Sequence, residues 1–195
     1  MLSNTIEFLA RNLIEFFILL LLARFYLQAA KVSFRHPIGQ FVLALTNWAV
    51  LPIRRLLPPF KGFDTTSIAL AWLCALGMHA LLLAISPWPF NFAALESVLA
   101  LTLIATLELV KMSLYLLFAA VIGQALMSWL SPYNPLMPIL KGLTEPFLRP
   151  LQKIIPPIGG IDITPFILIL LIQLLLNVFI VQMEPMILQR VVVTA

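Results

Sequence analysis

Long apolar segments alternate with polar, proline-rich connectors along the chain. Four of the apolar segments have the length of a membrane crossing, which takes about 20 residues in an α-helix. We place them at roughly 12–30, 66–86, 112–130 and 165–183. The apolar character begins well before the third segment, so residues 92–110 form a helix extension, an interfacial helix or a further span. The pattern predicts an all-α membrane protein with four transmembrane helices.

The connector between the first two segments recurs between the last two. The copies start at residues 45 and 143, lie 98 positions apart, and are identical at eight of 22 positions. Similarity at a fixed offset indicates duplication. We therefore divide the chain into a first repeat, 1–90, and a second repeat, 91–195. The shared structural motif consists of Pro58, Pro59, Gly62 and Asp64 in the first copy and Pro156, Pro157, Gly160 and Asp162 in the second.

Composition supports a bilayer as the solvent. Hydrophobic residues make up 62% of the chain and charged residues 10%, whereas soluble domains average about 45–50% and about 25%. The mean hydropathy is +1.06. These values exclude an ordinary soluble domain. The single cysteine, Cys74, excludes an internal disulfide and is expected to be a small buried hydrophobe.

The distribution of lysine and arginine predicts the topology. The two connectors together carry eight basic residues, the loop at 87–97 carries none, and the C-terminal tail carries only Arg190. Because Lys and Arg are retained on the cytoplasmic side, we expect both connectors in the cytoplasm and both termini in the periplasm of a bacterial inner membrane. The two repeats then insert in the same, parallel orientation.

Each connector is expected to contain an amphipathic segment that lies on the membrane surface. In the first, Phe41, Leu45 and Trp48 share one helical face ahead of the basic residues. The candidates for contact with anionic lipid or a partner are Arg54, Arg55, Lys61, Arg149 and Lys153. Alternatively, these residues only set the topology and stiffen the connector. We interpret Asp64 and Asp162 as N-caps, with ion ligation as the alternative.

Polar residues inside the predicted spans are the other candidates for function: Glu15, Arg24, His79, Gln124, Gln173 and Asn177. A charge in the bilayer is costly unless it is paired or hydrated. Arg24 is expected to snorkel and Glu15 to pair with Arg11. Repeat equivalence places His79 opposite Asn177, where both line a polar path or form ordinary interhelical hydrogen bonds.

Signals for catalysis and cofactors are missing from the sequence. The two histidines, His36 and His79, fall on different sides of the predicted membrane surface, so no metal cluster is expected. The sequence contains no Ser-His-Asp spacing, nucleotide-binding loop or HExxH motif. Its basic residues lack the aromatic interleaving of a nucleic-acid binder. We therefore expect no enzymatic activity, no cofactor and no direct nucleic-acid contact.

The repeated connector resembles the YggT family of bacterial and plastid membrane proteins. The resemblance is carried by the stretches 52–64 and 150–162, together with Ala23-Arg24-Phe25 and Met127-Ser128-Trp129 at the ends of the first and third spans. It implies a small integral inner-membrane protein without an established enzymatic activity. Members of the family have been associated with ion or osmotic homeostasis, cell-division gene neighbourhoods and plastid assembly roles. The resemblance implies no catalytic or binding residues.

Two functions are compatible with these patterns. The first is a non-enzymatic scaffold or assembly factor that contacts membrane lipids, a membrane-protein partner or a second copy of itself. The alternative is a small ion-conducting or ion-homeostasis protein whose pathway uses Glu15, Arg24, His79, Gln173 and Asn177. Convergence of these side chains on a water-accessible cavity favours the second function, and their dispersal among helix contacts favours the first.

Overall fold

A computed structural model describes residues 2–60, 62–85, 91–92, 94–131, 134–157, 162–183 and 185–187. Its helices are α1 (Leu2–Ala29), α2 (Pro37–Ile53), α3 (Thr65–Ile85), α4 (Leu95–Leu130), α5 (Met137–Ile154) and α6 (Thr164–Leu174), which continues as a π-helical turn at Leu175–Ile180. Extended pairing in the described residues is limited to one isolated bridge, Phe60 to Phe63. The predicted all-α class is confirmed for this part of the chain.

Three helices are long and apolar enough to cross a membrane: Thr65–Ile85, Leu95–Ser128 and Thr164–Ile187. The helix α1 has 28 residues and is about 42 Å long at 1.5 Å per residue. It therefore also has sufficient length, although it carries Glu15 and Arg24. The helices thus have the lengths that a membrane protein requires.

The helix α4 is a single, uninterrupted element of 36 residues. The sequence between Pro89 and Pro132 contains no proline, so nothing breaks the hydrogen-bond ladder there. Residues 95–110 are consequently the N-terminal part of α4. This confirms the helix extension among the three alternatives and excludes a separate fifth span within these residues.

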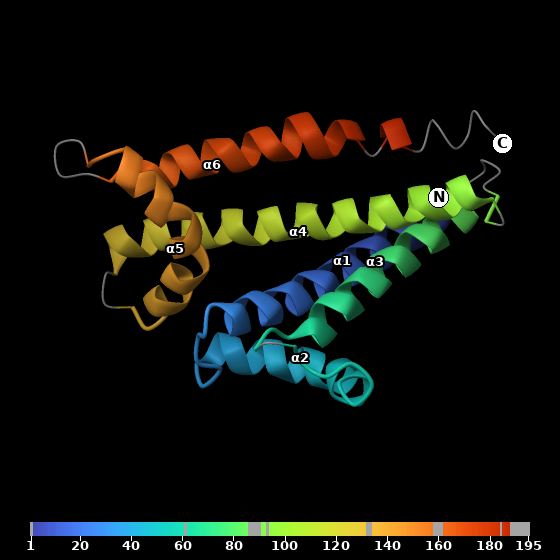
Figure 1. Ribbon diagram of the computed structural model, residues 1–195, viewed down its shortest axis with the longest axis horizontal. Coiled ribbons are helices and arrows are strands. Elements are labelled where there is room, and N and C mark those ends of the chain that lie inside the picture. The colour runs from blue at the N-terminus through green and yellow to red at the C-terminus, as the bar shows by residue number, and fades with distance from the viewer. Residues whose placement is uncertain are drawn as a thin grey trace.

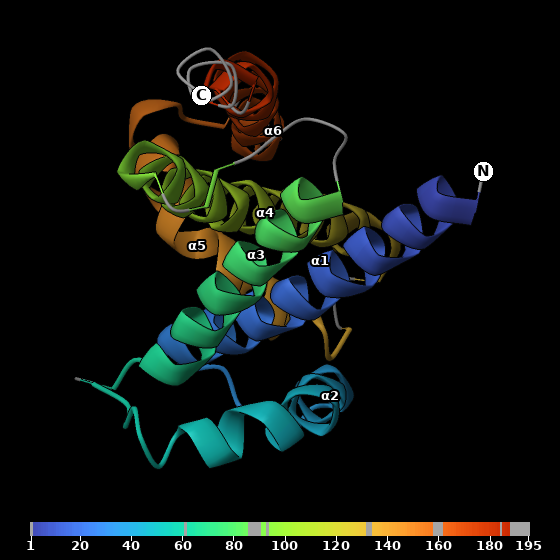
Figure 2. The same cartoon turned by 90° about the vertical axis from the view of Figure 1, so that its right-hand side faces the viewer.

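The two halves of α4 belong to different hydrophobic clusters. The N-terminal half packs with α1, α3 and Val50 of α2, where Ala71, Ala75 and Ala105 are fully buried. Small residues allow helices to approach closely in a membrane. The C-terminal half packs through Val121 with α5 and α6. Figures 1 and 2 accordingly show α4 between α6 and the crossed pair of α1 and α3.

The short helices α2 and α5 are the two connectors predicted from the sequence. Figures 1 and 2 show α2 on the side of the α1–α3 pair that faces away from α6. Its inner face buries Val42, Thr46 and Val50. On the other side of α2, Trp48 stacks on Phe17 of α1 and is still 71% exposed, so this helix is apolar on both sides. The helix α5 contacts α1, α4 and α6 and buries Thr144 and Leu148, among others.

Candidate functional site

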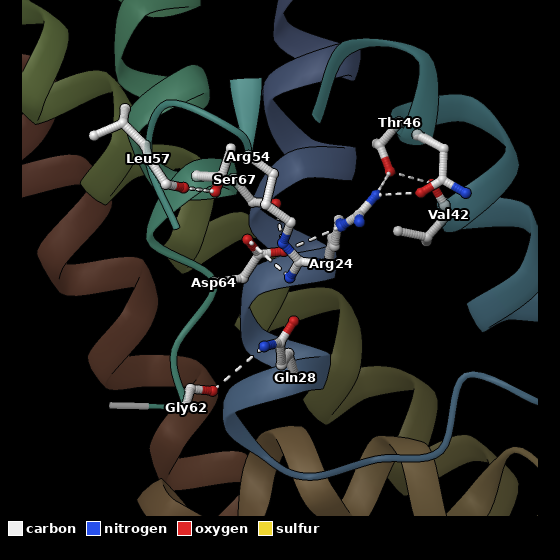
Figure 3. A network of polar contacts seen from close by, with 11 residues as sticks. Arg24, Gln28, Val42, Thr46, Arg54, Leu57, Gly62, Asp64 and Ser67 are labelled. Atoms are coloured by element: carbon white, nitrogen blue, oxygen red, sulfur yellow. Dashed lines mark hydrogen bonds and ion pairs between the residues drawn. The ribbon is translucent and has the colours of Figure 1, made fainter. Parts of the chain in front are cut away.

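A buried guanidinium fixes the first connector to the spans. Arg24 of α1 is only 3% exposed. Its Nε donates to Oδ2 of Asp64 at 3.1 Å. Its Nη1 donates to Oγ1 of Thr46 at 2.9 Å and to Oδ1 of Asn47 at 2.8 Å. Figure 3 shows how these contacts join α1 to α2 and to the residue that precedes α3. We call Arg24, Thr46, Asn47, Arg54 and Asp64 the first lock.

The carboxylate of Asp64 is the centre of the first lock. It is completely buried and also accepts a hydrogen bond from Ser67 Oγ at 2.9 Å. Its Oδ1 lies 3.5 Å from Nη2 of Arg54. Two guanidinium groups therefore face one carboxylate, which gives the lock an excess positive charge. Within the described residues, Asp64 Oδ1 and Arg54 Nε have no hydrogen-bond partner.

These contacts modify two expectations from the sequence. Asp64 does stand directly before α3, as an N-cap would, but its side chain is turned onto Arg24 and Ser67. The expectation that Arg24 snorkels is wrong, because its side chain is buried and ion-paired. A buried partner for Arg24 was missed because the two residues are 40 positions apart in the sequence.

The second repeat has an equivalent network in which amides replace the guanidinium groups. Gln124, which aligns with Arg24, accepts a hydrogen bond from Thr144, the equivalent of Thr46. Gln152, which aligns with Arg54, donates to Oδ2 of Asp162 at 2.9 Å. We call Gln124, Thr144, Gln152, Asp162 and Thr164 the second lock. The second lock contains one charged group, Asp162, whereas the first lock contains three: Arg24, Arg54 and Asp64.

Asp162 also caps the start of α6, as predicted. Its Oδ1 accepts hydrogen bonds from the amide of Thr164 at 2.9 Å and from the Thr164 hydroxyl at 2.6 Å. Burial alone would raise the pKa of Asp162, but the hydrogen bonds from Thr164 and Gln152 outweigh it and lower the pKa below its ordinary value. Asp162 is therefore ionised at neutral pH.

Threonines at equivalent positions of the two repeats are fully buried in and beside the two locks. Thr46 and Thr144 are both fully buried, and so are Thr66 and Thr164. Thr66 Oγ1 donates to the carbonyl of Leu57 at 2.6 Å. Each hydroxyl thus has a partner, as buried polar groups require. Together they tie the connector to the beginning of the following helix.

The proline and glycine positions shape the path between connector and span. Pro58 and Pro59 follow the end of α2, as Pro156 and Pro157 follow the end of α5. Gly62 has φ +86°, a left-handed conformation that favours glycine. Its carbonyl accepts a hydrogen bond from Gln28 at 3.3 Å. Two further residues predicted for this motif and its surroundings, Lys61 and Gly160, lie outside the described residues.

A second charged cluster lies between α3 and α4, inside their apolar stretches. Glu108 is 3% exposed and His79 is 5% exposed. Oε2 of Glu108 lies 2.6 Å from Nζ of Lys111 and 3.5 Å from Nε2 of His79. Within the described residues, Glu108 Oε1 and His79 Nε2 have no hydrogen-bond partner. We call His79, Glu108 and Lys111 the intramembrane cluster.

Sequence reasoning identified His79 in this cluster but missed Glu108 and Lys111. It began the third span at residue 112 and therefore left both residues outside it. The spacing of three between the two charges was the available signal, because such residues share a helix face. Their place near the middle of α4 follows only from the unbroken length of that helix.

The remaining polar candidates do not converge on one place, although Gln173 and Asn177 contact each other on α6. Glu15 pairs with Arg11 at 2.9 Å, as expected. Gln173 and Asn177 are exposed on α6, where the Asn177 amide donates to the carbonyl of Gln173 at 2.9 Å. His79 contacts Glu108 instead of facing Asn177. Among the described residues, the shared polar lining, one of the two alternatives for His79, Gln124, Gln173 and Asn177, therefore does not form.

The basic residues of the connectors differ in accessibility. Arg54 is partly buried in the first lock, whereas Arg149 forms a surface pair with Glu145 at 2.7 Å. Arg55 and Lys153, which are equivalent by the repeat, are both exposed. In the part of the chain that the structure describes, no three His, Cys, Asp or Glu side chains form a group that would hold a metal ion.

Comparison with known proteins places this architecture in a family. The family described as CCB3/YggT matches residues 3–85 and 103–183, that is, once in each repeat. A protein of Vibrio alginolyticus, encoded in the proC 3′ region, is 33% identical over 172 residues, covering 87% of this chain and 90% of the relative. The YggT protein of Escherichia coli K12 is 31% identical over 173 residues, covering 88% and 87%. No solved structure matches the chain. The double match and these two relatives show that the chain belongs to the CCB3/YggT family.

Proposed function

We propose that this protein is a non-enzymatic scaffold or assembly factor of the bacterial inner membrane. In this proposal four helices, α1, α3, α4 and α6, cross the bilayer in two parallel repeats. The helices α2 and α5 lie at the cytoplasmic surface, where they contact lipid headgroups and a membrane-protein partner. The N- and C-terminal ends of the chain are periplasmic.

The proposal rests mainly on what the polar side chains of the spans contact. Arg24 and Gln124 each bind the threonine at the same position of their connector: Arg24 binds Thr46, and Gln124 binds Thr144. They are used to hold a connector in place and do not line a common path. A connector that is fixed in this way presents a constant surface to a partner, which favours scaffolding over transport.

Two further observations support the orientation. Eight basic residues lie in the two connectors and none in the loop at 87–97, which favours cytoplasmic connectors. In Figure 1, α1 and α4 both run toward the end of the molecule where α5 lies. The first helix of each repeat thus points in the same direction, which favours a parallel arrangement of the two repeats.

The exposed faces of the connectors have the character of a surface for lipid and protein contact. Trp48 and Leu45 on α2 are exposed, and Arg55 follows at the end of that helix. Lys153 occupies the equivalent position at the end of α5 and is exposed as well. Each basic residue near an anionic leaflet contributes about 1 kcal/mol of attraction, and the apolar side chains add buried area.

Cross-linking of the full-length protein in membranes, followed by affinity capture, tests the proposal. The double variant Arg55→Gln with Lys153→Gln removes exposed charge and leaves both locks intact. We expect a specific captured partner to be lost from this variant. The matched control is Arg149→Gln with Glu145→Gln, which removes a surface pair without changing net charge. Equal recovery of the partner by the double variant and the wild type would contradict the role of the connectors.

The intramembrane cluster favours ion handling as a second candidate function. Buried ionisable groups in membrane helices are functional candidates by default, and Glu108 has an oxygen without a hydrogen-bond partner in the described residues. Ion flux into proteoliposomes is the test, with Glu108→Gln and His79→Ala compared with the wild type. Flux that is absent, or that is the same in all three proteins, would remove this candidate.

A further inference from the structure

An apolar cavity lies where the two repeats meet. Its volume is about 410 Å³, within the range of about 300–1,000 Å³ that is usual for small-molecule sites. The first repeat contributes Leu22 and Tyr26 from α1, and α5 of the second repeat contributes Leu143 and Phe147. The long wall is formed by α4, from Thr106 to Leu117. Neither lock nor the intramembrane cluster contributes a side chain to it.

The hydroxyls of Thr106 and Ser113 in the cavity wall already have partners. Thr106 Oγ1 donates to the carbonyl of Thr102 at 2.8 Å and accepts from Trp72 Nε1 at 3.1 Å. Ser113 Oγ donates to the carbonyl of Leu109 at 2.7 Å. Both hydroxyls already donate their proton to a backbone carbonyl, so neither is a free hydrogen-bond donor for a ligand. Apolar cavities also do not hold water. The chemistry of the wall therefore selects a hydrocarbon occupant.

The length of the cavity matches one leaflet of a bilayer. Thr106 and Leu117 are eleven positions apart in α4, which corresponds to about 16 Å along the helix axis. One leaflet contributes about half of the hydrocarbon core of roughly 30 Å. A single acyl chain that is aligned with α4 would fill this length.

Two lysines that form no ion pair in the described residues flank the contact between α5 and the turn after α1. There the backbone of α5 rests on the end of α1, since a Cβ added to Gly142 would lie 2.8 Å from Val32 Cγ2. The chain neighbours of these two residues are Lys141 and Lys31, both exposed. A backbone bond of 2.9 Å from Val32 to Leu27 holds the turn that carries Lys31. Positive charge thus stands beside this contact, two residues before Leu143 of the cavity wall.

We propose that this cavity binds one acyl chain of an anionic glycerophospholipid, whose phosphate lies between Lys31 and Lys141. The lipid bridges the two repeats, because α1 and α5 each contribute one lysine and part of the wall. The site rests on the membrane orientation given under the proposed function, but it does not require a protein partner. Loss of lipid binding would leave capture of a partner through Arg55 and Lys153 unchanged.

Photo-cross-linking in nanodiscs tests the site directly. The full-length protein is reconstituted in phosphatidylcholine with a trace of phosphatidylglycerol that carries a diazirine in its acyl chain. A phosphatidylcholine probe with the same acyl chain is the headgroup control. We expect the phosphatidylglycerol probe to label residues 106–117 and 143–147, and unlabelled phosphatidylglycerol to compete with it. Each of Lys31→Gln and Lys141→Gln should reduce this labelling about fivefold, the factor that corresponds to one surface lysine.

Cavity filling provides the independent arm. Ser113→Phe should abolish labelling by either probe, whereas Leu103→Phe, at a lipid-facing position that is 55% exposed, should not change it. Both variants are first checked for a monodisperse elution profile and native helix content. Labelling of α6 and the cavity to the same degree, or failure of unlabelled lipid to compete, would overturn the site. Equal labelling by the two probes would refute headgroup recognition.

Discussion

Neutralising the carboxylate of the first lock should destabilise the protein far more than neutralising its repeat equivalent. The substitution Asp64→Asn keeps the shape of the side chain but leaves Arg24 and Arg54 without their counter-charge. Arg24 is 3% exposed, so it has no route to water. The matched substitution, Asp162→Asn, affects an exposed carboxylate whose partners, Gln152 and Thr164, are neutral.

The expected difference follows from the environments of the two aspartates. Removing one partner of a buried ion pair costs about 3–5 kcal/mol. Arg24 keeps its hydrogen bonds to Thr46 and Asn47, so we expect a loss of about 3 kcal/mol for Asp64→Asn, near the lower limit. Loss of an ordinary hydrogen bond costs about 0.5–1.5 kcal/mol, which is the range for Asp162→Asn. The two variants should therefore differ by about 2 kcal/mol.

Equilibrium unfolding in mixed detergent micelles measures the free energy of unfolding of both variants, with circular dichroism at 222 nm as the signal. A third protein, Arg24→Gln with Asp64→Asn, removes the stranded charge and should recover part of the loss. Equal losses for Asp64→Asn and Asp162→Asn would refute the assignment of the first lock as a buried ion pair. The same conclusion would follow if the double variant were less stable than Asp64→Asn alone, because the two changes would then show no favourable coupling.

Three smaller predictions accompany this one. Thr144→Val should lower the free energy of unfolding by about 1 kcal/mol, because Gln124 loses its partner; an unchanged value would count against the second lock. Glu108→Ala leaves Lys111, whose side chain is only 13% exposed, without a counter-charge and should cost about 3 kcal/mol, measured in the same micelles; a neutral effect would contradict the intramembrane cluster. The lowered pKa of Asp162 adds stability above the unfolded pKa of about 3.9, and this stability is lost as the pH falls through the lower folded pKa. Asp162→Asn should therefore weaken the dependence of the free energy of unfolding on acidic pH. The same acid dependence in the variant and the wild type would argue against this role.

The architecture was accessible from the sequence because duplication and hydropathy leave strong signals. The repeated connector predicted which residues play equivalent roles, and the contacts of Gln124 with Thr144 and of Arg24 with Thr46 agree with that alignment. The helix extension was one of three alternatives, because hydropathy does not indicate where a continuous apolar stretch enters the bilayer. The continuous helical hydrogen bonding of α4 decides between these three alternatives.

The partners of the polar side chains were less predictable. Arg24 and Asp64 come together across 40 residues, and the presence of Asp in both copies suggested a shared role without identifying its partner. His79 and Asn177 are equivalent by sequence, but the cores around them are different. The helix α3 packs on α4 beside Glu108, whereas Asn177 lies in the π-helical turn of α6. Such a turn inserts an extra residue and changes the direction of the side chains.

The sidedness of the two connectors tests the central claim most directly. In a background with Cys74→Ala, which removes the single cysteine of the chain, one new cysteine is placed at Arg55 and, in a separate protein, at Lys153. Both proteins are treated with a membrane-impermeant maleimide in right-side-out and inverted inner-membrane vesicles. Parallel repeats with cytoplasmic connectors predict that both positions are labelled only in inverted vesicles. Labelling of either position in right-side-out vesicles would contradict the account.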